Sequence, residues 1–412
     1  MYITEKKLLK WALYANAIYI LLLFLFRPNG INITKIVITS LLLFSVFTIF
    51  IICFRNRKQL KTIPKYLRIL FYLLIFYSCI VIVRSFSLSL QDWVTNFGNV
   101  YMAFAWLVPL VLILGTKIEN WVIVFKATNF MFNLMIFAAL LLPFYVEVRT
   151  EWTWLIRPVN FILLLGLYHY RQDRLKIYLI IAISLIIAYR THQRMEYLYI
   201  GLVLGFLLLD KLFSFKIKKR FLKYILGSFI LVFTLIFTVG YEFVSSIIAN
   251  VIEFQDSRTF LFTELRGELA KTQDQLFGRG SLGTYFSQFF ENTRSFWEKQ
   301  GYNGHVDLWG DDPKRITVEV GYLQMLLKGG GVLLILNVVI SIITIYLALF
   351  RSNNKFIRRL GYYILIITIL SLVSFRPAFT PTFIIFWMAI GTILNKKYRM
   401  LKDDEIEKLI QF

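Results

Sequence analysis

Long apolar runs alternate with short polar links along most of this chain. The runs match the roughly 20 apolar residues with which a helix crosses about 30 Å of hydrocarbon. The pattern therefore predicts an all-α integral membrane protein with about twelve transmembrane helices. The predicted spans are residues 8–26, 33–53, 67–83, 100–115, 121–143, 158–170, 175–189, 196–213, 221–241, 331–350, 357–375 and 378–394.

One long polar stretch interrupts the pattern after the ninth run. It divides the chain into helices 1 to 9 (1–241), a large loop (242–330), helices 10 to 12 (331–394) and a tail (395–412). Because the other links are so short, a loop of this length is expected to carry function.

Composition and charge support a membrane protein rather than a nucleic-acid-binding one. The chain is 58% hydrophobic and only 17% charged, too little charge for the surface of a soluble domain. Its net charge of +22 comes largely from Lys and Arg in alternate links and both tails, as membrane topology requires. Both termini are therefore predicted to be cytoplasmic, and the large loop lies outside. The two cysteines, Cys53 and Cys79, lie outside the loop, which excludes a cysteine–zinc site there.

The short links on the predicted outer side favour arginine over lysine, whereas the inner links favour lysine. Topology requires only positive charge, so this preference favours bidentate phosphate binding by the planar guanidinium. The alternative is that arginine snorkels well at an interface. These outer residues are Arg27, Lys35, Arg84, Arg149, Arg157, Arg190, Arg194 and Arg376.

The first candidate site is the pair Arg190 and Arg194 in AYRTHQRMEYLYIG. Residues four apart share a face of a helix, so the pair is predicted to clamp a diphosphate. The alternative is that Glu196 and interfacial water neutralise the two arginines.

The second candidate is an amphipathic helix predicted over 257–276 in the loop, together with the glycine-rich turn that follows it. Arg258 and Arg279 flank this run. Glycines in such a turn let the backbone approach a ligand or a helix end. The turn follows no buried strand, so a dinucleotide site is not predicted. The glycines are Gly278, Gly280 and Gly283.

Two residues of the loop are candidate proton acceptors. His305 is the only histidine of the loop, and its imidazole can take a proton from a sugar hydroxyl. The alternative is a solvated loop histidine, and no metal site is predicted from the aspartates near it. Glu319 lies in a segment predicted as a helix along the outer membrane face, broken at Gly329–Gly331.

Taken together, these stretches resemble the O-antigen polymerase (Wzy) and O-antigen ligase superfamily. Ten residues separate Arg190 from Gly201, similar to the arginine-x10-glycine motif described for Wzy loops, and the same spacing links Arg194 to Gly205. Position 269 is Leu, so Arg258 does not begin a further copy. The other matching strings are SR-T at 257–259, FGRGSLG at 277–283, His305 and VEVGYLQMLLKGGG at 318–331.

The resemblance implies a GT-C-like, metal-independent, inverting glycosyltransferase of the bacterial cytoplasmic membrane, with no cofactor. The donor glycan would be carried on undecaprenyl diphosphate, and a largely helical loop would cover the site. His305 is the first candidate to deprotonate the acceptor hydroxyl, and Glu319 the second. The residues assigned to the diphosphate are Arg190, Arg194, Arg258, Arg279 and Arg376.

The class of acceptor stays open at this point. A polymerase, which extends another lipid-linked repeat unit, is favoured over a ligase, which transfers glycan to lipid A core. A lipid-linked oligosaccharide transporter would favour charges in mid-span, and these are scarce here. A non-catalytic assembly partner is a further alternative. The expected partners are the bilayer, the lipid-linked oligosaccharide, a chain-length regulator and a flippase, but not nucleic acid.

Overall fold

The computed structural model describes most of the chain, and nearly all of its regular structure is helical. The described residues are 4–26, 33–144, 153–166, 174–212, 215–238, 257–272, 274–288 and 314–410. The helices before the loop are α1 (Glu5–Leu25), α2 (Ile33–Arg55), η1 (Arg57–Thr62), α3 (Lys65–Val83), α4 (Leu90–Asn96), η2 (Ala103–Val111), α5 (Leu112–Gly115), α6 (Asn120–Leu141), η3 (Leu142–Phe144), α7 (Thr153–Gly166), α8 (Arg174–Arg190), α9 (Arg194–Leu212) and α10 (Phe215–Thr238).

The remaining elements belong to the loop and the C-terminal part. A two-stranded antiparallel sheet pairs Tyr285 with Arg315 and Phe286 with Lys314. These elements are α12 (Ser257–Lys271), β1 (Tyr285–Phe286), β2 (Lys314–Arg315), α14 (Gly321–Phe350), α15 (Lys355–Ser371), α16 (Pro381–Leu394), α17 (Lys396–Met400) and α18 (Asp403–Leu409).

Helices coincide with the predicted apolar runs, so the helical membrane fold is confirmed at this level. Within the described residues, α2, α3, α6 and α14 are long and apolar enough to cross a membrane. The stretch from Ala103 to Gly115, the helix α7 and the helix α16 are apolar but shorter. Twelve crossings therefore stay a prediction.

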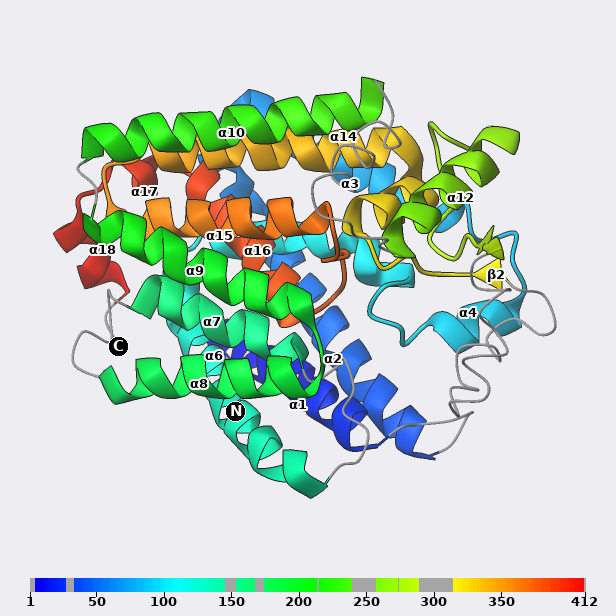
Figure 1. The fold of residues 1–412 in the computed structure, drawn as a ribbon, viewed down its shortest axis with the longest axis horizontal. Helices are drawn as coiled ribbons and strands as arrows, with labels where there is room; N and C mark the ends of the chain where they lie inside the picture. Colours follow the sequence, from blue (N-terminus) through cyan, green and yellow to red (C-terminus); the bar gives the residue numbers. More distant parts are fainter. Residues whose placement is uncertain are drawn as a thin grey trace.

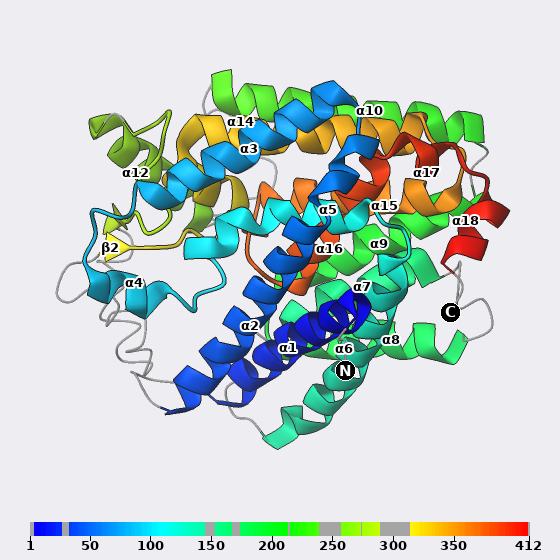
Figure 2. The ribbon, with the colours of Figure 1, turned by 180° about the vertical axis from the view of Figure 1, so that it is seen from behind.

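The longer helices run between two distinct ends of the molecule (Figures 1 and 2). At one end, here called the loop end, lie α4, α12 and the two strands. At the opposite end, here called the tail end, lie α17 and α18. The helices α9, α14 and α15 extend between these ends, so residues at their opposite termini belong to different ends of the fold.

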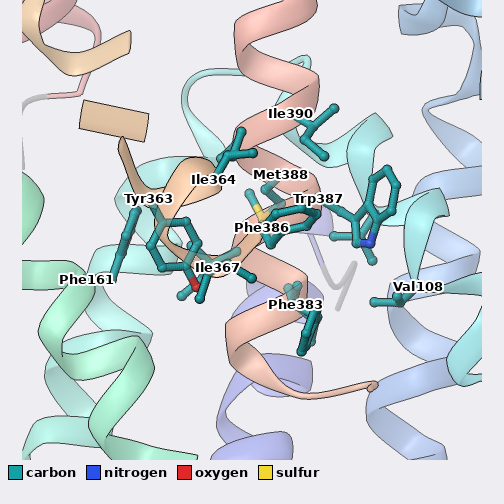
Figure 3. Packing of buried hydrophobic residues seen from close by; sticks show 14 of the residues in the cluster. Val108, Phe161, Tyr363, Ile364, Ile367, Phe383, Phe386, Trp387, Met388 and Ile390 are labelled. Carbon is teal, nitrogen blue, oxygen red and sulfur yellow. The ribbon is translucent and has the colours of Figure 1, made fainter. Parts of the chain in front are cut away.

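Helix α16 forms the centre of the bundle. All of its residues are buried, as expected for a helix that is apolar on every side. Figure 3 shows Phe386 and Met388 between Val108 of η2 on one side and Tyr363 and Ile367 of α15 on the other.

Two details of the fold differ from the sequence predictions, and a third agrees with them. The predicted helix over 315–328 is wrong at its start, because Arg315 pairs in β2 and the helix begins only at Gly321. The predicted helix break at the glycine triplet is confirmed, because Gly330 has non-helical backbone angles (φ 63°, ψ −166°) and kinks α14 there. Helix α7 begins at Thr153, because Pro158 is accommodated within it.

Candidate functional site

Arg376 lies in the link between α15 and α16, half-buried at the loop end. Its Cζ lies 3.9 Å from the centre of the Tyr101 ring, and that ring in turn meets the Trp154 ring edge to face at 5.7 Å. Stacking on an aromatic face fixes the plane of a guanidinium while leaving its N–H groups at the edge. None of the described residues accepts a hydrogen bond from Arg376, so the group is oriented and available to an anion.

Arg157 of α7 lies next to this link and is held from two sides. Its Nε and Nη2 donate to Oε1 of Glu196 at 2.9 and 2.7 Å. Its Cζ lies 3.6 Å from the centre of the Phe375 ring. Glu196 is only 1% exposed, so this ion pair is shielded from water and much less screened than a surface pair.

Arg315 of β2 and Glu319, which lies between β2 and α14, complete the cluster. Nη2 of Arg315 donates to Oε1 of Glu319. Burial alone would raise the pKa of the Glu319 carboxyl, but the charges of Arg315 and Arg376 outweigh it and lower the pKa. A Cβ on Gly321 would lie 2.3 Å from the Phe375 carbonyl oxygen, so glycine lets α14 start against the link that carries Arg376. We call Arg157, Arg315 and Arg376 the arginine cluster.

The lowered pKa of Glu319 predicts a specific pH dependence. The ion pair with Arg315 stabilises the fold at every pH above the ordinary carboxyl pKa of about 4.5, and this contribution is lost as pH falls through the lower folded pKa. The melting-temperature gap between wild type and Glu319→Gln should stay constant from pH 7 to 5 and close only below about pH 4.5. A gap that closes above pH 5 would contradict the assignment.

A small cavity adjoins the cluster inside the bundle. It has a volume of about 40 Å³ and lies between α14, α15 and α16. Its wall includes Pro377, the residue after Arg376, and Tyr322, three residues after Glu319. The segments that carry Arg376 and Glu319 therefore also contribute to the wall of this cavity.

The glycine-rich turn of the loop docks on α14 through backbone hydrogen bonds. The Arg279 N–H donates to the Leu327 carbonyl at 2.8 Å, and the Gly280 N–H donates to the Lys328 carbonyl at 2.9 Å. In the opposite direction, Nζ of the buried Lys328 donates a hydrogen bond to the Gly283 carbonyl at 2.7 Å. The turn therefore approaches a helix, which is one of the two uses expected for its glycines.

Glycine is required on both sides of this contact. A Cβ on Gly278 would lie 2.5 Å from the Lys328 carbonyl carbon, and one on Gly330 would lie 2.2 Å from the Leu276 oxygen. The residue that caps the C-terminus of α3 adds a further attachment, because Arg84 Nη1 donates to the Phe277 carbonyl at 2.6 Å. The two glycine-rich strings of the sequence, 278–283 and 329–331, are therefore two halves of one packing contact.

Gly330→Ala should release the loop from α14, whereas Gly331→Ala should not. Gly330 occupies a backbone region open essentially to glycine alone, so alanine adds strain of about 1–3 kcal/mol in addition to the clash. A Cβ on Gly331 meets only the Gln275 oxygen, at 3.7 Å. Limited proteolysis of the loop in detergent should be faster in the first variant alone, and equal rates would argue against the docking.

The prediction that Arg190 and Arg194 share one helix face is wrong. Helix α8 ends at Arg190 and α9 begins at Arg194, because the chain turns at His192, which adopts a left-handed φ of 52°. Both arginines are exposed. Glu196, the suggested neutralising partner, binds Arg157 instead. Phosphate binding by Arg190 and Arg194 stays a prediction.

Arg279 is engaged within the loop itself. Its Nε donates to Asp274 at 3.1 Å, its Nη1 to the Thr284 carbonyl at 2.8 Å and its Nη2 to the Thr272 hydroxyl at 2.9 Å. These bonds favour a structural role for Arg279 over its predicted contact with a diphosphate.

Several other predicted features are not placed in a site. His305 and the aspartates near it lie outside the described residues, as does the side chain of Arg258. Gly201 and Gly205 are exposed on α9, and a Cβ on either would meet no other part of the described chain within 4 Å. The arginine-x10-glycine spacing therefore marks no close packing here.

Sequence reasoning named Arg157 only as one of the outer arginines, missed Arg315 as a site residue and misjudged the partner of Glu196. Arg157 and Arg376 each precede a proline at the edge of an apolar, aromatic-rich run. That shared pattern was the available signal, although Arg27, which lies outside the described residues, shows it as well.

In comparisons with known proteins, no family model, no curated protein and no solved structure matches this chain.

Proposed function

We propose that this chain is a membrane glycosyltransferase that takes glycan from a polyprenyl diphosphate, and that it acts as a polysaccharide polymerase. The observation that carries the proposal is Arg376, oriented on Tyr101, with no hydrogen-bond acceptor among the described residues. An oriented guanidinium at the end of an apolar bundle suits a phosphate whose lipid stays in the bilayer.

Glycosyl transfer needs a group that neutralises the leaving diphosphate and a group that accepts the proton of the acceptor hydroxyl. The acceptor oxygen forms a bond to the anomeric carbon, the bond from that carbon to the phosphate oxygen breaks, and the diphosphate leaves with the electron pair. Arg376 neutralises the departing charge, and Nη1 of Arg157, which Glu196 does not engage, offers a further N–H donor nearby. His305 is the first candidate to take the proton of the acceptor hydroxyl. Glu319 is the second, although the charge of Arg315, which keeps it ionised, also makes it a weaker base.

The setting proposed for this reaction is the bacterial cytoplasmic membrane. Both termini would be cytoplasmic, and the loop end would face outward. The substrate is an undecaprenyl-diphosphate-linked oligosaccharide, and a flippase and a chain-length regulator are the proposed partners. The apolar helices support the membrane assignment, and the remaining features rest on the charge pattern and on the resemblance to Wzy polymerases and O-antigen ligases.

The test is complementation of a strain that lacks this gene, scored by glycan chain length. The informative variants are Arg376→Ala and Arg157→Ala, each checked for membrane abundance. Arg351→Ala is the matched control, because Arg351 is an exposed arginine after the last residue of α14. We expect Arg376→Ala and Arg157→Ala to leave single repeat units and the control to restore full chains.

Two other outcomes would change the conclusion. Long lipid-linked polymer with no transfer to lipid A core would identify a ligase. Normal chains in both cluster variants, at normal protein levels, would remove the support for catalysis at this site.

A further inference from the structure

A second, larger cavity lies at the tail end, away from the arginine cluster. Its volume is about 650 Å³, and its walls come from α9, α10, α15 and α18. Figure 1 places α18 at the opposite end of the bundle from α12. The charged residues of the wall are Asp210, Lys211, Lys218, Lys355, Arg358, Arg359, Asp403, Asp404 and Glu407.

One of these carboxylates is already satisfied by the protein. Asp210 Oδ1 accepts from the Lys218 ammonium at 3.1 Å and from the Tyr362 hydroxyl at 3.1 Å. Asp210 Oδ2 accepts from Arg359 Nε at 3.3 Å. The positive charge of the wall therefore exceeds what Asp210 can balance, because both Lys218 and Arg359 share this one carboxylate.

Arg359 points to an anionic ligand. Its side chain is only 8% exposed, and its Nη1 is buried without a hydrogen-bond acceptor in the described part of the chain. A buried charged donor without an acceptor is costly. Lys355, Arg358 and Arg359 all lie near the N-terminus of α15, so the positive end of a helix dipole adds to the same wall.

The part of the wall formed by α18 carries negative charge. Asp403, Asp404 and Glu407 all lie on α18. The Lys355 N–H donates to Asp403 Oδ1 at 2.6 Å, which joins α18 to the start of α15. A cavity whose wall carries both basic and acidic side chains suits a ligand that carries a phosphate and an ammonium together, rather than a dianion.

Apolar side chains lead from the cavity to the outside of the bundle. Leu204, Leu207 and Leu208 of α9 belong to its wall, and Leu208 is 54% exposed. On a helix of a membrane protein, exposed leucines face acyl chains. A soluble phosphate ester would gain nothing from this strip, whereas a lipid would bury its chains along it.

We infer that the tail-end cavity binds the headgroup of a zwitterionic glycerophospholipid of the phosphoethanolamine class. The phosphate lies against Arg359 and the start of α15, the ammonium lies against the carboxylates of α18, and the acyl chains follow the leucines of α9. This site is independent of the proposed glycosyl transfer and would stand if that proposal failed.

Native mass spectrometry of the purified full chain with added lipid tests the inference. We expect phosphatidylethanolamine to bind wild type and Lys355→Glu to weaken binding about tenfold, the equivalent of one charged contact. Arg359→Gln should weaken it at least as much. Lys396→Glu is the matched control, because Lys396 is an exposed lysine in the first turn of α17 and is not part of the cavity wall.

Arg359→Gln also removes a hydrogen-bond partner of Asp210. The melting temperature of each variant is therefore measured, to separate a loss of lipid binding from a loss of stability. Lys355 is exposed, so Lys355→Glu should fold normally. Equal lipid affinity in Lys355→Glu and Lys396→Glu would overturn the site. Displacement of the lipid by millimolar inorganic phosphate or free phosphoethanolamine would overturn the lipid as its ligand. Stronger binding of phosphatidylglycerol would overturn the zwitterionic headgroup.

Discussion

Arg376→Lys is expected to slow glycan transfer by about 100- to 1,000-fold, the usual cost of losing one donor that stabilises a developing anion. Lysine keeps the charge but loses both the planar fork and the stacking on Tyr101. Because Arg376 lies in a link and is only half-buried, the variant should still fold. The loss should fall mainly on kcat, since the leaving diphosphate gains charge in the transition state.

The measurement is the initial rate of repeat-unit transfer in proteoliposomes supplied with a lipid-diphosphate-linked donor. Arg351→Lys, which makes the same chemical change at an exposed arginine after α14, should keep the wild-type rate. Tyr101→Leu should give a smaller loss of rate, because it removes only the aromatic face that orients Arg376. A rate for Arg376→Lys within threefold of wild type would contradict its assigned role.

The helical elements could be predicted because hydrophobic runs of membrane length leave little choice of structure. The predictions failed where the backbone conformation of a few residues determines the structure. His192 turns the chain between Arg190 and Arg194, and the apolar spacing around them gave no sign of the turn. Likewise, the helical spacing after Arg315 concealed a strand that pairs with Tyr285, a partner 30 positions earlier in the sequence.

The type of residue in the candidate site could be predicted from the sequence, but only some of its individual residues could. An excess of arginine in the short links drew attention to the correct residue type, and Arg376 and Glu319 were both named from the sequence. The ion pair between Arg157 and Glu196 could not be predicted, because these two residues come together only when α7 packs on α9. Long-range pairing of this kind leaves no local pattern in a single sequence.

The role of the two glycine-rich strings, 278–283 and 329–331, also could not be decided from the sequence alone. From the sequence alone, the glycines around Gly280 were equally compatible with a ligand and with a helix end. The structure resolves this for the described residues, since the turn packs against Gly329 and Gly330. The glycines of each string allow the close approach of the other string, and this contact fixes the loop to the bundle.

The crossing of α5 and α16 gives the largest expected effect on stability, through Gly391→Ala. A Cβ on Gly391 would lie 1.9 Å from the Leu112 carbonyl oxygen, and one on Gly115 would lie 1.9 Å from the Met388 oxygen. The obstacle is backbone at the centre of the bundle, so neither helix can yield locally. We expect a loss of about 3 kcal/mol, the upper end of the usual cost of overpacking.

Denaturant unfolding in detergent micelles measures this loss. Gly201→Ala is the matched control, because Gly201 lies within helix α9 with no other part of the described chain within 4 Å of its Cβ. There alanine should be neutral or stabilising by about 0.5–1 kcal/mol, the difference in helix propensity. The Thr392 hydroxyl, which donates to the Gly115 carbonyl at 2.7 Å, should lose that bond in Gly391→Ala. Similar unfolding midpoints for the two alanine variants would show that α5 and α16 do not cross at these glycines.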